Sequence, residues 1–183
     1  LVDVHGWGLE KIGWFVILPF VVADFGNILG GLFTQYIIKK GMAVQRARKV
    51  SVSIFGSLMG FSLILGPLMI NSPASALVVL SIAGFGYAAY TSNTMAFPGD
   101  VVPQSAIASV WGIASVGAGF GGMIFQSLSG ITVKHLSISY NYAIAYNTIF
   151  VAYGFMALIG LSIVLFVIGP LVENKELRQY VQT

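Results

Sequence analysis

Residues 13–38, GWFVILPFVVADFGNILGGLFTQYII, decide the fold, because only one of these 26 residues, Asp24, carries a charge. A helix of this length crosses the hydrocarbon core of a bilayer, which is about 30 Å thick. The stretch therefore predicts a transmembrane helix. An ionised carboxylate near the bilayer midplane costs at least ~2.5 kcal/mol unless it faces protein, water or a partner. We therefore expect Asp24 to face away from lipid.

The following segment, KKGMAVQRARK at residues 39–49, holds five cations and no acidic residue. Short loops rich in Lys and Arg remain in the cytoplasm, so the first helix is predicted to enter from outside and to end inside. In the resulting topology seven of the nine Lys and Arg residues lie inside, and two, Lys11 and Lys134, lie outside. The C-terminus is then predicted to be cytoplasmic.

The composition is that of an integral membrane protein, with 57% hydrophobic and 8% charged residues, whereas a soluble domain has about 25% charged residues. The net charge of +3 does not indicate a nucleic-acid partner, because five of the nine cations lie in one loop between apolar segments. Zero cysteines exclude disulfides and thiolate metal sites, and two histidines are too few for a metal cluster. No metal or other cofactor is expected.

Four further apolar segments follow, and together they predict an all-α fold, a polytopic transmembrane helix bundle. The five predicted spans are about 13–38, 50–70, 76–98, 105–133 and 143–171. The loops expected between the later spans are 71–75, 98–105 and 134–142, and the charged tail 172–183 is expected in the cytoplasm. Five spans place the two termini on opposite sides, and the chain begins without Met or a signal segment, so we expect it to be a piece of a longer polypeptide.

Glycines at four-residue spacing predict close contacts between helices. Gly26 and Gly30 in the first span, and Gly56 and Gly60 in the second, form small-xxx-small patterns that let another helix approach. The fourth span holds five glycines between residues 112 and 122, which would let its backbone bend or approach neighbours.

Polar side chains gather in the third and fourth spans. In the third span Tyr87, Tyr90 and Thr94 fall on one helical face, with Asn93 close beside it. These groups could hydrogen-bond between helices or line a water-filled cavity. In the fourth span Ser115 shares a face with Trp111 and Gly119, at four-residue spacing.

The motifs exclude several function classes. The sequence has no G-x-S-x-G, H-E-x-x-H, G-x-G-x-x-G or P-loop pattern, so an enzyme is not expected. It also has no filter-like loop or ring-forming charge pattern of a channel. Prolines within helices, glycines at crossings and one midplane carboxylate are typical of a secondary transporter.

Two segments carry a resemblance to a known family. They are WFVILPFVVADFGNILGG at 14–31, followed by KKG, and YTSNTMAFPGDVVPQSAIASVWGIASVGAGFGGM at 90–123. Both resemble the C-terminal half of major facilitator superfamily transporters, and in particular the bacterial hexuronate and sugar-acid permeases of the anion:cation symporter branch. The resemblance covers essentially the whole chain. It implies that the five spans are helices eight to twelve of a twelve-helix fold, with the N-terminal half of the protein absent from this sequence.

This resemblance implies a function. A protein of this kind takes up a hexuronate or a related organic anion together with protons by alternating access, in the bacterial inner membrane and surrounded by lipid. Helices eight, ten and eleven would border the central cavity, and helices nine and twelve would lie outside it. Two alternatives remain: a transporter of the same superfamily for a neutral sugar or a drug, and a membrane scaffold or receptor that transports nothing.

The resemblance also implies site residues. Tyr87 and Tyr90, with Asn93 three residues on, correspond to substrate-facing groups of the tenth helix, and Ser115 to one of the eleventh. The family's G-G-x-x-x-D-R motif has Gln and Tyr at its charged positions here, so a charge-based inner latch is not expected. For Asp24, with Asn27 one turn on, two readings stay open. The carboxyl group either accepts hydrogen bonds that hold the bundle together, or it binds and releases a proton during transport.

Overall fold

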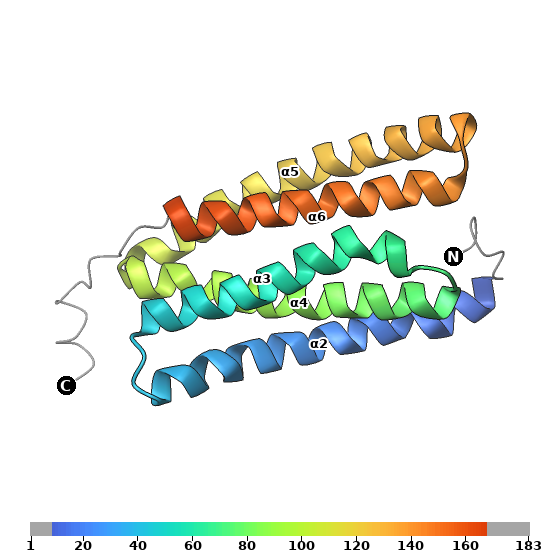
Figure 1. Ribbon diagram of the computed structural model, residues 1–183. Helices are drawn as coiled ribbons and strands as arrows, with labels where there is room; N and C mark the ends of the chain where they lie inside the picture. Colours follow the sequence, from blue (N-terminus) through green and yellow to red (C-terminus); the bar gives the residue numbers. More distant parts are fainter. Residues whose placement is uncertain (1–8, 168–183) are drawn as a thin grey trace.

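Five long helices joined by short turns make up the part of the chain that the structure, a computed structural model, describes, residues 9–167 (Figure 1). Each is long and apolar enough to cross a membrane, which confirms the prediction of an all-α, polytopic bundle. The expected end of the last span at 171 and the tail 172–183 lie outside the described residues. The helices are α2 (Leu9–Lys39), α3 (Val44–Met69), α4 (Pro73–Val101), α5 (Gln104–Ser139) and α6 (Tyr142–Val167).

The connections are shorter than the apolar pattern predicts. The expected loop at 134–142 is wrong for most of its length, because α5 continues to Ser139. The expected loop at 98–105 shrinks likewise, because α4 runs to Val101. The start of α4 is fixed by a capping box, in which the Ser72 side chain accepts from the Ser75 N–H, with Pro73 in the first turn. The apolar pattern predicts only the part of a helix that lies in the hydrocarbon core. The ends of the helix are set by capping and turn residues.

The turn between α2 and α3 is tight, and backbone hydrogen bonds close the end of α2. Gly41 has a positive φ of 97°, which favours glycine. Its N–H donates to the Ile38 carbonyl at 2.9 Å, and the Met42 N–H donates to the Ile37 carbonyl at 3.3 Å. This pair of bonds is a Schellman motif, which satisfies the last carbonyls of α2 and reverses the chain. The end of α2 and the start of α3 are thereby held next to each other.

Helices α2 and α4 cross with their backbones in direct contact. A methyl group on Gly26 would lie 2.5 Å from the Phe85 carbonyl oxygen, and one on Gly30 would lie 2.7 Å from the Ala89 Cα. Only glycine fits at both positions. The close approach predicted from the spacing of these two glycines is confirmed.

Helix α3 packs against α4 on one side and α6 on the other. A methyl group on Gly86 of α4 would lie 2.8 Å from the Met59 nitrogen, and one on Gly154 of α6 would lie 2.8 Å from the Gly60 carbonyl oxygen. The prediction of a close contact at the second glycine pair is therefore confirmed. The apolar core lies at the junction of these three helices and consists of Val52, Phe97 and Leu161, with Tyr90 and Leu158 packed against it.

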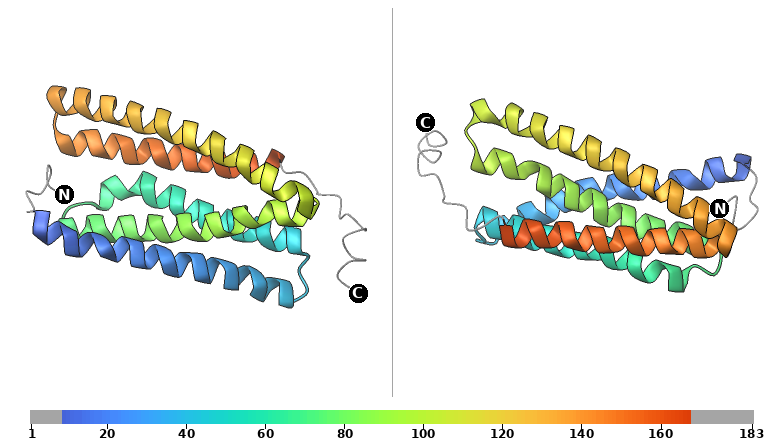
Figure 2. Two further views of the ribbon diagram at one scale, coloured as in Figure 1. Left: turned by 180° about the vertical axis from the view of Figure 1, so that it is seen from behind. Right: turned by 90° about the horizontal axis from the view of Figure 1, so that it is seen from above.

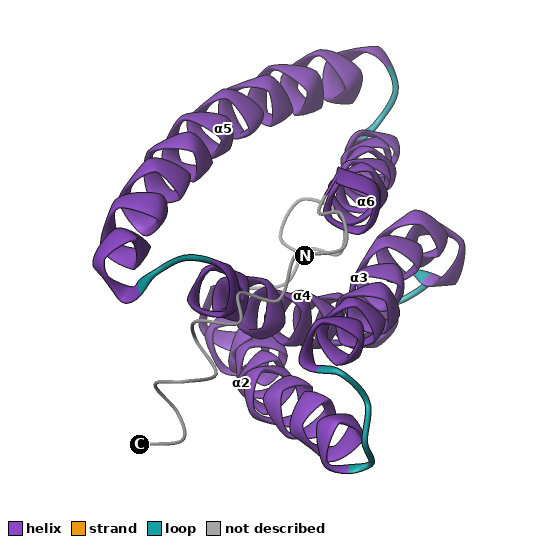
Figure 3. Ribbon diagram, turned by 90° about the vertical axis from the view of Figure 1, so that its left-hand side faces the viewer, coloured by secondary structure: helices purple, strands orange, loops and turns teal. Residues whose placement is uncertain are grey.

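Helix α5 lies away from α2 and α3, and its neighbours are α6 and, at its start, α4 (Figures 2 and 3). None of its residues is buried, and a methyl group on any of its glycines at 112–122 would have no neighbouring atom within 4 Å. Its link to α6 runs through Tyr153, whose hydroxyl lies 3.0 Å from Ser129 Oγ and whose ring is 6.1 Å from that of Phe125. These glycines were expected to let the backbone bend or approach neighbours, and no close neighbour of them is found within residues 9–167.

Candidate functional site

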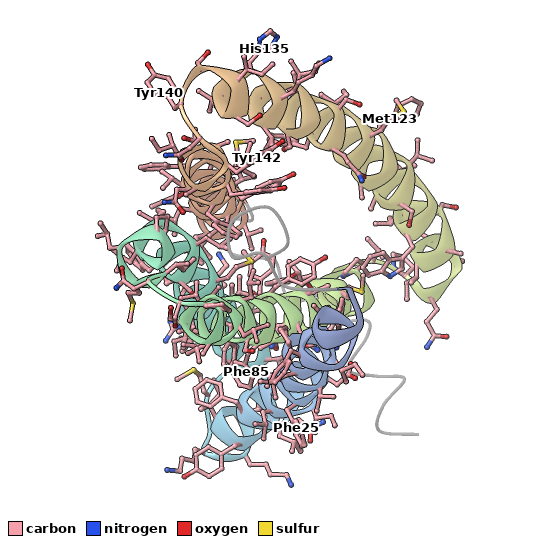
Figure 4. The ribbon with its side chains drawn as sticks, turned by 90° about the vertical axis from the view of Figure 1, so that its right-hand side faces the viewer. Phe25, Phe85, Met123, His135, Tyr140 and Tyr142 are labelled. Carbon is pink, nitrogen blue, oxygen red and sulfur yellow. The ribbon has the colours of Figure 1, made fainter. Side chains whose placement is uncertain are left out.

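Helix α2 has three distinct faces. The first is the packed face with Gly26, Gly30 and Thr34, which meets α4. The second is an exposed apolar face, and Figure 4 shows one of its side chains, Phe25, on the outer side of α2, whereas Phe85 lies between α4 and α2. The members of the apolar face are Leu18, Phe25, Leu29, Leu32 and Tyr36, between 47% and 56% exposed.

The third face of α2 carries four small or polar residues between exposed apolar ones such as Phe20 (69% exposed) and Ile28 (59%), and we call these four the polar row. Asp24, Asn27, Gly31 and Gln35 follow one another at spacings of three and four residues, so they share one side of the helix. Asp24, Asn27 and Gln35 are exposed. Within residues 9–167 the structure gives Asp24 no hydrogen bond and no ion pair, so the bundle described here supplies none of the partners that a structural role would need.

The open face of α4 carries hydroxyl groups. Tyr87 is 58% exposed, and Thr91 and Thr94 are half-buried on the same side, four and seven residues on. Thr94 Oγ1 donates to the Tyr90 carbonyl at 2.6 Å, within the helix. Tyr90 itself is half-buried, with its ring against Gly56 of α3 and the apolar core. The two tyrosines therefore differ: Tyr87 faces outward from the described bundle, and Tyr90 packs between α4 and α3.

Asn93 lies in a buried polar cluster that joins three helices. Its side chain is 1% exposed, as buried as Ser51 (0%) of α3 and Thr34 (3%) of α2. Thr34 Oγ1 donates to Asn93 Oδ1 at 2.5 Å and lies 2.6 Å from Ser51 Oγ. Asn93 Nδ2 donates to the Gly30 carbonyl at 3.2 Å and to the Ala89 carbonyl at 2.9 Å. Both the oxygen and the nitrogen of the Asn93 amide are therefore hydrogen-bonded inside the bundle, at the point where α2 and α4 touch.

Sequence reasoning singled out Asn93 but missed Thr34, its main side-chain partner. A signal was available, because Thr34 follows Gly26 and Gly30 at the same four-residue spacing and so extends the packed face of α2. A hydroxyl on a packed face needs a polar partner, and here Asn93 of the neighbouring helix supplies it.

Ser115 is exposed on a face of α5 where small and polar residues follow the half-buried Trp111. Trp111, Ser115, Gly119 and Gln126 share this side, and Ser115 makes no hydrogen bond within the described part of the chain. The opposite side of α5 is apolar and exposed, with Met123 projecting outward from it in Figure 4. Helix α5 therefore divides, like α2, into a small and polar face and an apolar one.

The polar side chains described above belong to α2, α4 and α5. In Figure 3 α4 lies between α2, which is below it, and the start of α5, which is to its left, with α3 and α6 to its right. The exposed side chains of α3 are apolar along its length, from Val50 through Ile54 and Phe61 to Leu68. A shallow hollow of about 330 Å³ on α6, lined by Ile144, Asn147, Thr148 and Val151, includes none of the predicted site residues.

The chemistry available on the polar side is that of neutral hydrogen-bonding groups and one carboxylate. Tyrosine, threonine and serine hydroxyls can both donate to and accept from the hydroxyl groups of a solute. Asp24 can accept hydrogen bonds or bind a proton. No Lys or Arg occurs between residues 50 and 133, so these spans offer no cationic side chain at membrane depth.

Comparison with known proteins places the chain in a family. The family model of the Major Facilitator Superfamily matches residues 1–180. The chain is similar to the probable galactarate/D-glucarate transporter GarP of Escherichia coli (strain K12), with 26% identity over 181 residues, or 98% of this chain and 38% of that protein. The hexuronate transporter of the same strain is 28% identical over 77% of this chain and 32% of its own length.

A third relative, the D-galactonate transporter of Escherichia coli O6:H1, is 28% identical over 73% of this chain and 29% of its own length. The chain thus spans well under half the length of these curated relatives. All three are named as transporters, which agrees with the prediction that the chain is not an enzyme. With the five membrane-spanning helices and a family match over almost its whole length, the chain belongs to the Major Facilitator Superfamily.

Proposed function

We propose that this chain forms part of a secondary transporter that moves a sugar acid or a related organic anion together with protons by alternating access. The observation that carries the proposal is the set of polar side chains that α2, α4 and α5 expose within apolar helices, with a carboxylate among those of α2. Polar groups at membrane depth line solute pathways or contact protein, because lipid cannot satisfy them. Relatives named as transporters of galactarate, hexuronate and galactonate support the substrate class.

In this proposal Tyr87 and Ser115 contact the solute directly, because both are exposed on polar faces. Tyr90 contributes the edge of its ring and its hydroxyl from a half-buried position. Asn93 acts through the pairing of α2 and α4, since its amide is occupied within the buried cluster. The solute's carboxylate is held elsewhere in the polypeptide, because these spans supply no cationic side chain.

A transporter of the same superfamily for a neutral sugar is the second candidate. The same absence of Lys and Arg between residues 50 and 133 favours it, because hydroxyl groups alone suffice to bind a neutral sugar. The two candidates differ in whether the rest of the polypeptide supplies a cation to the site. A scaffold or receptor without transport activity is the third reading.

Counterflow separates the three. The full-length polypeptide that contains this chain is reconstituted in proteoliposomes loaded with unlabelled glucuronate, and entry of radiolabelled glucuronate is followed at several pH values. We expect saturable entry, faster uptake with an inward proton gradient, and competition by galactarate but not by glucose. Saturable entry of radiolabelled glucose into glucose-loaded vesicles, without saturable entry of glucuronate, would favour the neutral-sugar transporter, and no saturable entry of either solute would favour the scaffold.

Asp24 allows a sharper test of proton coupling. Asn keeps the shape and hydrogen-bonding capacity of a protonated Asp but cannot titrate. If Asp24 is structural, Asp24→Asn should retain expression and most proton-driven uptake. If Asp24 carries the coupled proton, the variant should keep solute exchange and lose uphill accumulation. Asn27→Ala, on the same polar row, is the matched control for a general disturbance of this face.

We also propose that the turn between α2 and α3 faces the cytoplasm of a bacterial inner membrane, as the cation bias predicts. A cysteine introduced at Ala43, which is exposed in this turn, should resist an impermeant thiol reagent added outside intact cells. A cysteine at Ser137, near the opposite end of α5, should react. Residues 1–183 contain no cysteine, and any cysteine elsewhere in the full-length polypeptide is first replaced by serine. Labelling of Ala43→Cys from outside would show that this turn faces outward and would contradict the proposed orientation.

A further inference from the structure

The turn between α2 and α3 concentrates positive charge at a fixed place. Lys39 ends α2, Lys40 follows it in the turn, and Arg46 lies in the first turn of α3; all three are exposed. The Schellman motif at Gly41 holds the two helix ends together. Residues 36–50 contain no Asp or Glu, so no acidic neighbour in this stretch neutralises the three side chains. We call Lys39, Lys40 and Arg46 the basic turn.

The basic turn lies at the end of two rows of exposed apolar residues, one on α2 and one on α3. On α2 the exposed apolar face ends at Tyr36, which is 55% exposed and lies one turn before the two lysines. The Lys40 ammonium lies 4.5 Å from the centroid of the Tyr36 ring, a cation–π contact at the level where aromatic rings mark the membrane interface. On α3, Arg46 begins a row at three- and four-residue spacing that continues with Val50, Ile54, Leu58, Phe61, Leu65 and Leu68, all exposed.

The position of Arg46 also runs against the local preference of a helix. A cation near a helix N-terminus is opposed by the macrodipole, and acidic residues are the favoured ones there. Helix α3 has no acidic residue in its first turn, and its N-cap residue, Ala43, makes no side-chain capping bond. Sequences that break a local rule without a structural gain usually do so at a functional site. An anion bound at the basic turn would supply the missing negative charge.

We propose that the basic turn binds the phosphate headgroup of an anionic phospholipid, whose acyl chains lie along the exposed apolar faces of α2 and α3. A soluble phosphate would need the cations alone, whereas the structure joins the cations to two apolar rows and an interfacial tyrosine, which fits an amphipathic ligand. Clusters of Lys and Arg beside transmembrane helices attract anionic lipid headgroups in general. Arg48 and Lys49 are half-buried and already interact with other residues, so they add charge without serving as ligands.

The test is lipid binding to the full-length polypeptide by native mass spectrometry, with phosphatidylglycerol and phosphatidylethanolamine of identical acyl chains. The test variant is Lys39→Gln/Lys40→Gln/Arg46→Gln. A charge-preserving variant, Lys39→Arg/Lys40→Arg/Arg46→Lys, and Lys134→Gln at the far end of α5 are the controls. We expect the parent to prefer phosphatidylglycerol and the glutamine variant to lose that preference by about tenfold, because each cation near the membrane surface adds to the attraction.

Both controls should keep the parent's preference, and glycerol phosphate in solution should not displace the lipid. The proposal fails if the parent shows no preference, if the glutamine variant matches the parent, or if Lys134→Gln loses as much. Displacement by glycerol phosphate at similar concentration would instead show a site for soluble anions and would also overturn it. If the triple variant does not assemble, the single change Lys40→Gln is used instead. It should still lower the preference for phosphatidylglycerol, by less than the triple change would, and an unchanged preference would overturn the proposal.

Discussion

Helices α2 and α5 carry the same glycine-rich signal and use it differently. On α2, Gly26 and Gly30 place the backbone against Phe85 and Ala89, so that no methyl group fits. On α5, a methyl group added to the glycines at 112–122 would meet no atom within 4 Å in the described part of the chain. Glycine spacing therefore marks a face that another backbone can approach, and it does not say whether this chain provides that backbone.

The largest effect on stability should come from a larger side chain at the glycine contact between α2 and α4. Gly30→Val would drive two methyl groups into Ala89 and push α2 away from α4. Overpacking of a core costs ~1–3 kcal/mol and more where backbone must move, so we expect the upper end of this range or beyond. The measurement is thermal unfolding of the purified full-length polypeptide in detergent, read by intrinsic fluorescence.

The matched substitution in α5, whose glycines have no close neighbour in the described part of the chain, is Gly119→Val. Because open space surrounds Gly119 among residues 9–167, the substitution should leave the assembly of α2, α3 and α4 intact and act on solute uptake instead. Equal destabilisation by both substitutions would remove the distinction between a closed and an open glycine face. Equal tolerance of both would show that α2 and α4 do not touch as described.

A smaller effect is expected from the buried polar cluster. Asn93→Leu keeps the approximate volume but removes the hydrogen bond that Asn93 accepts from Thr34 and the one that it donates to the Gly30 carbonyl. Hydrogen bonds between membrane helices contribute ~0.6 kcal/mol on average, and a buried polar group left without a partner costs ~1–3 kcal/mol. We expect a loss of about 1–3 kcal/mol in the free energy of unfolding.

Ser127→Ala is the control for this loss, because Ser127 bonds only its own helix, through the Met123 carbonyl, at an exposed position. Its effect should be within ~0.5 kcal/mol of zero, as for most surface substitutions. If Asn93→Leu behaves like Ser127→Ala, the cluster does not hold α2 to α4, and a direct contact between Asn93 and the solute becomes the better explanation of this residue.

The smallest effect on stability, with a measurable effect on transport, should come from Tyr87→Phe. The hydroxyl of Tyr87 belongs to a side chain that is 58% exposed, so its removal should not change thermal unfolding. One lost hydrogen bond to the solute is worth about 1 kcal/mol, which corresponds to roughly a fivefold higher KM for uptake. An unchanged KM would remove Tyr87 from the pathway.

The sequence predicted the bundle because apolar length and glycine spacing are local properties. Asp24 within an apolar stretch and five cations in one loop were enough to place the first helix and its end. The surroundings of Asn93 could not be predicted in the same way, because its partner Thr34 lies 59 residues away in the chain. Tyr87 and Asn93 lie within two turns of one helix but on different sides of it, and Asn93 is buried because α2 packs on its side.

The loops were overestimated for a related reason. Polar residues at 134–139 suggested a loop, but outside the hydrocarbon core they extend α5 as a helix. Hydropathy reports contact with lipid, whereas helix ends depend on caps such as Ser72 and on turns such as Gly41. Both differences arise where the environment of a residue, rather than its type, decides the structure.

Cysteine accessibility tests most directly the central claim that the polar faces of α2, α4 and α5 line the solute pathway. Residues 1–183 contain no cysteine, so once any cysteine elsewhere in the full-length polypeptide has been replaced by serine, single cysteines at Tyr87, Ser115 and the apolar-face control Phe61 can be compared in proteoliposomes. We predict that a water-soluble maleimide labels Tyr87→Cys and Ser115→Cys, that glucuronate slows both reactions, and that Phe61→Cys reacts slowly with or without glucuronate. Labelling of Phe61→Cys as fast as the other two, or no protection by glucuronate at Tyr87 and Ser115, would contradict the account.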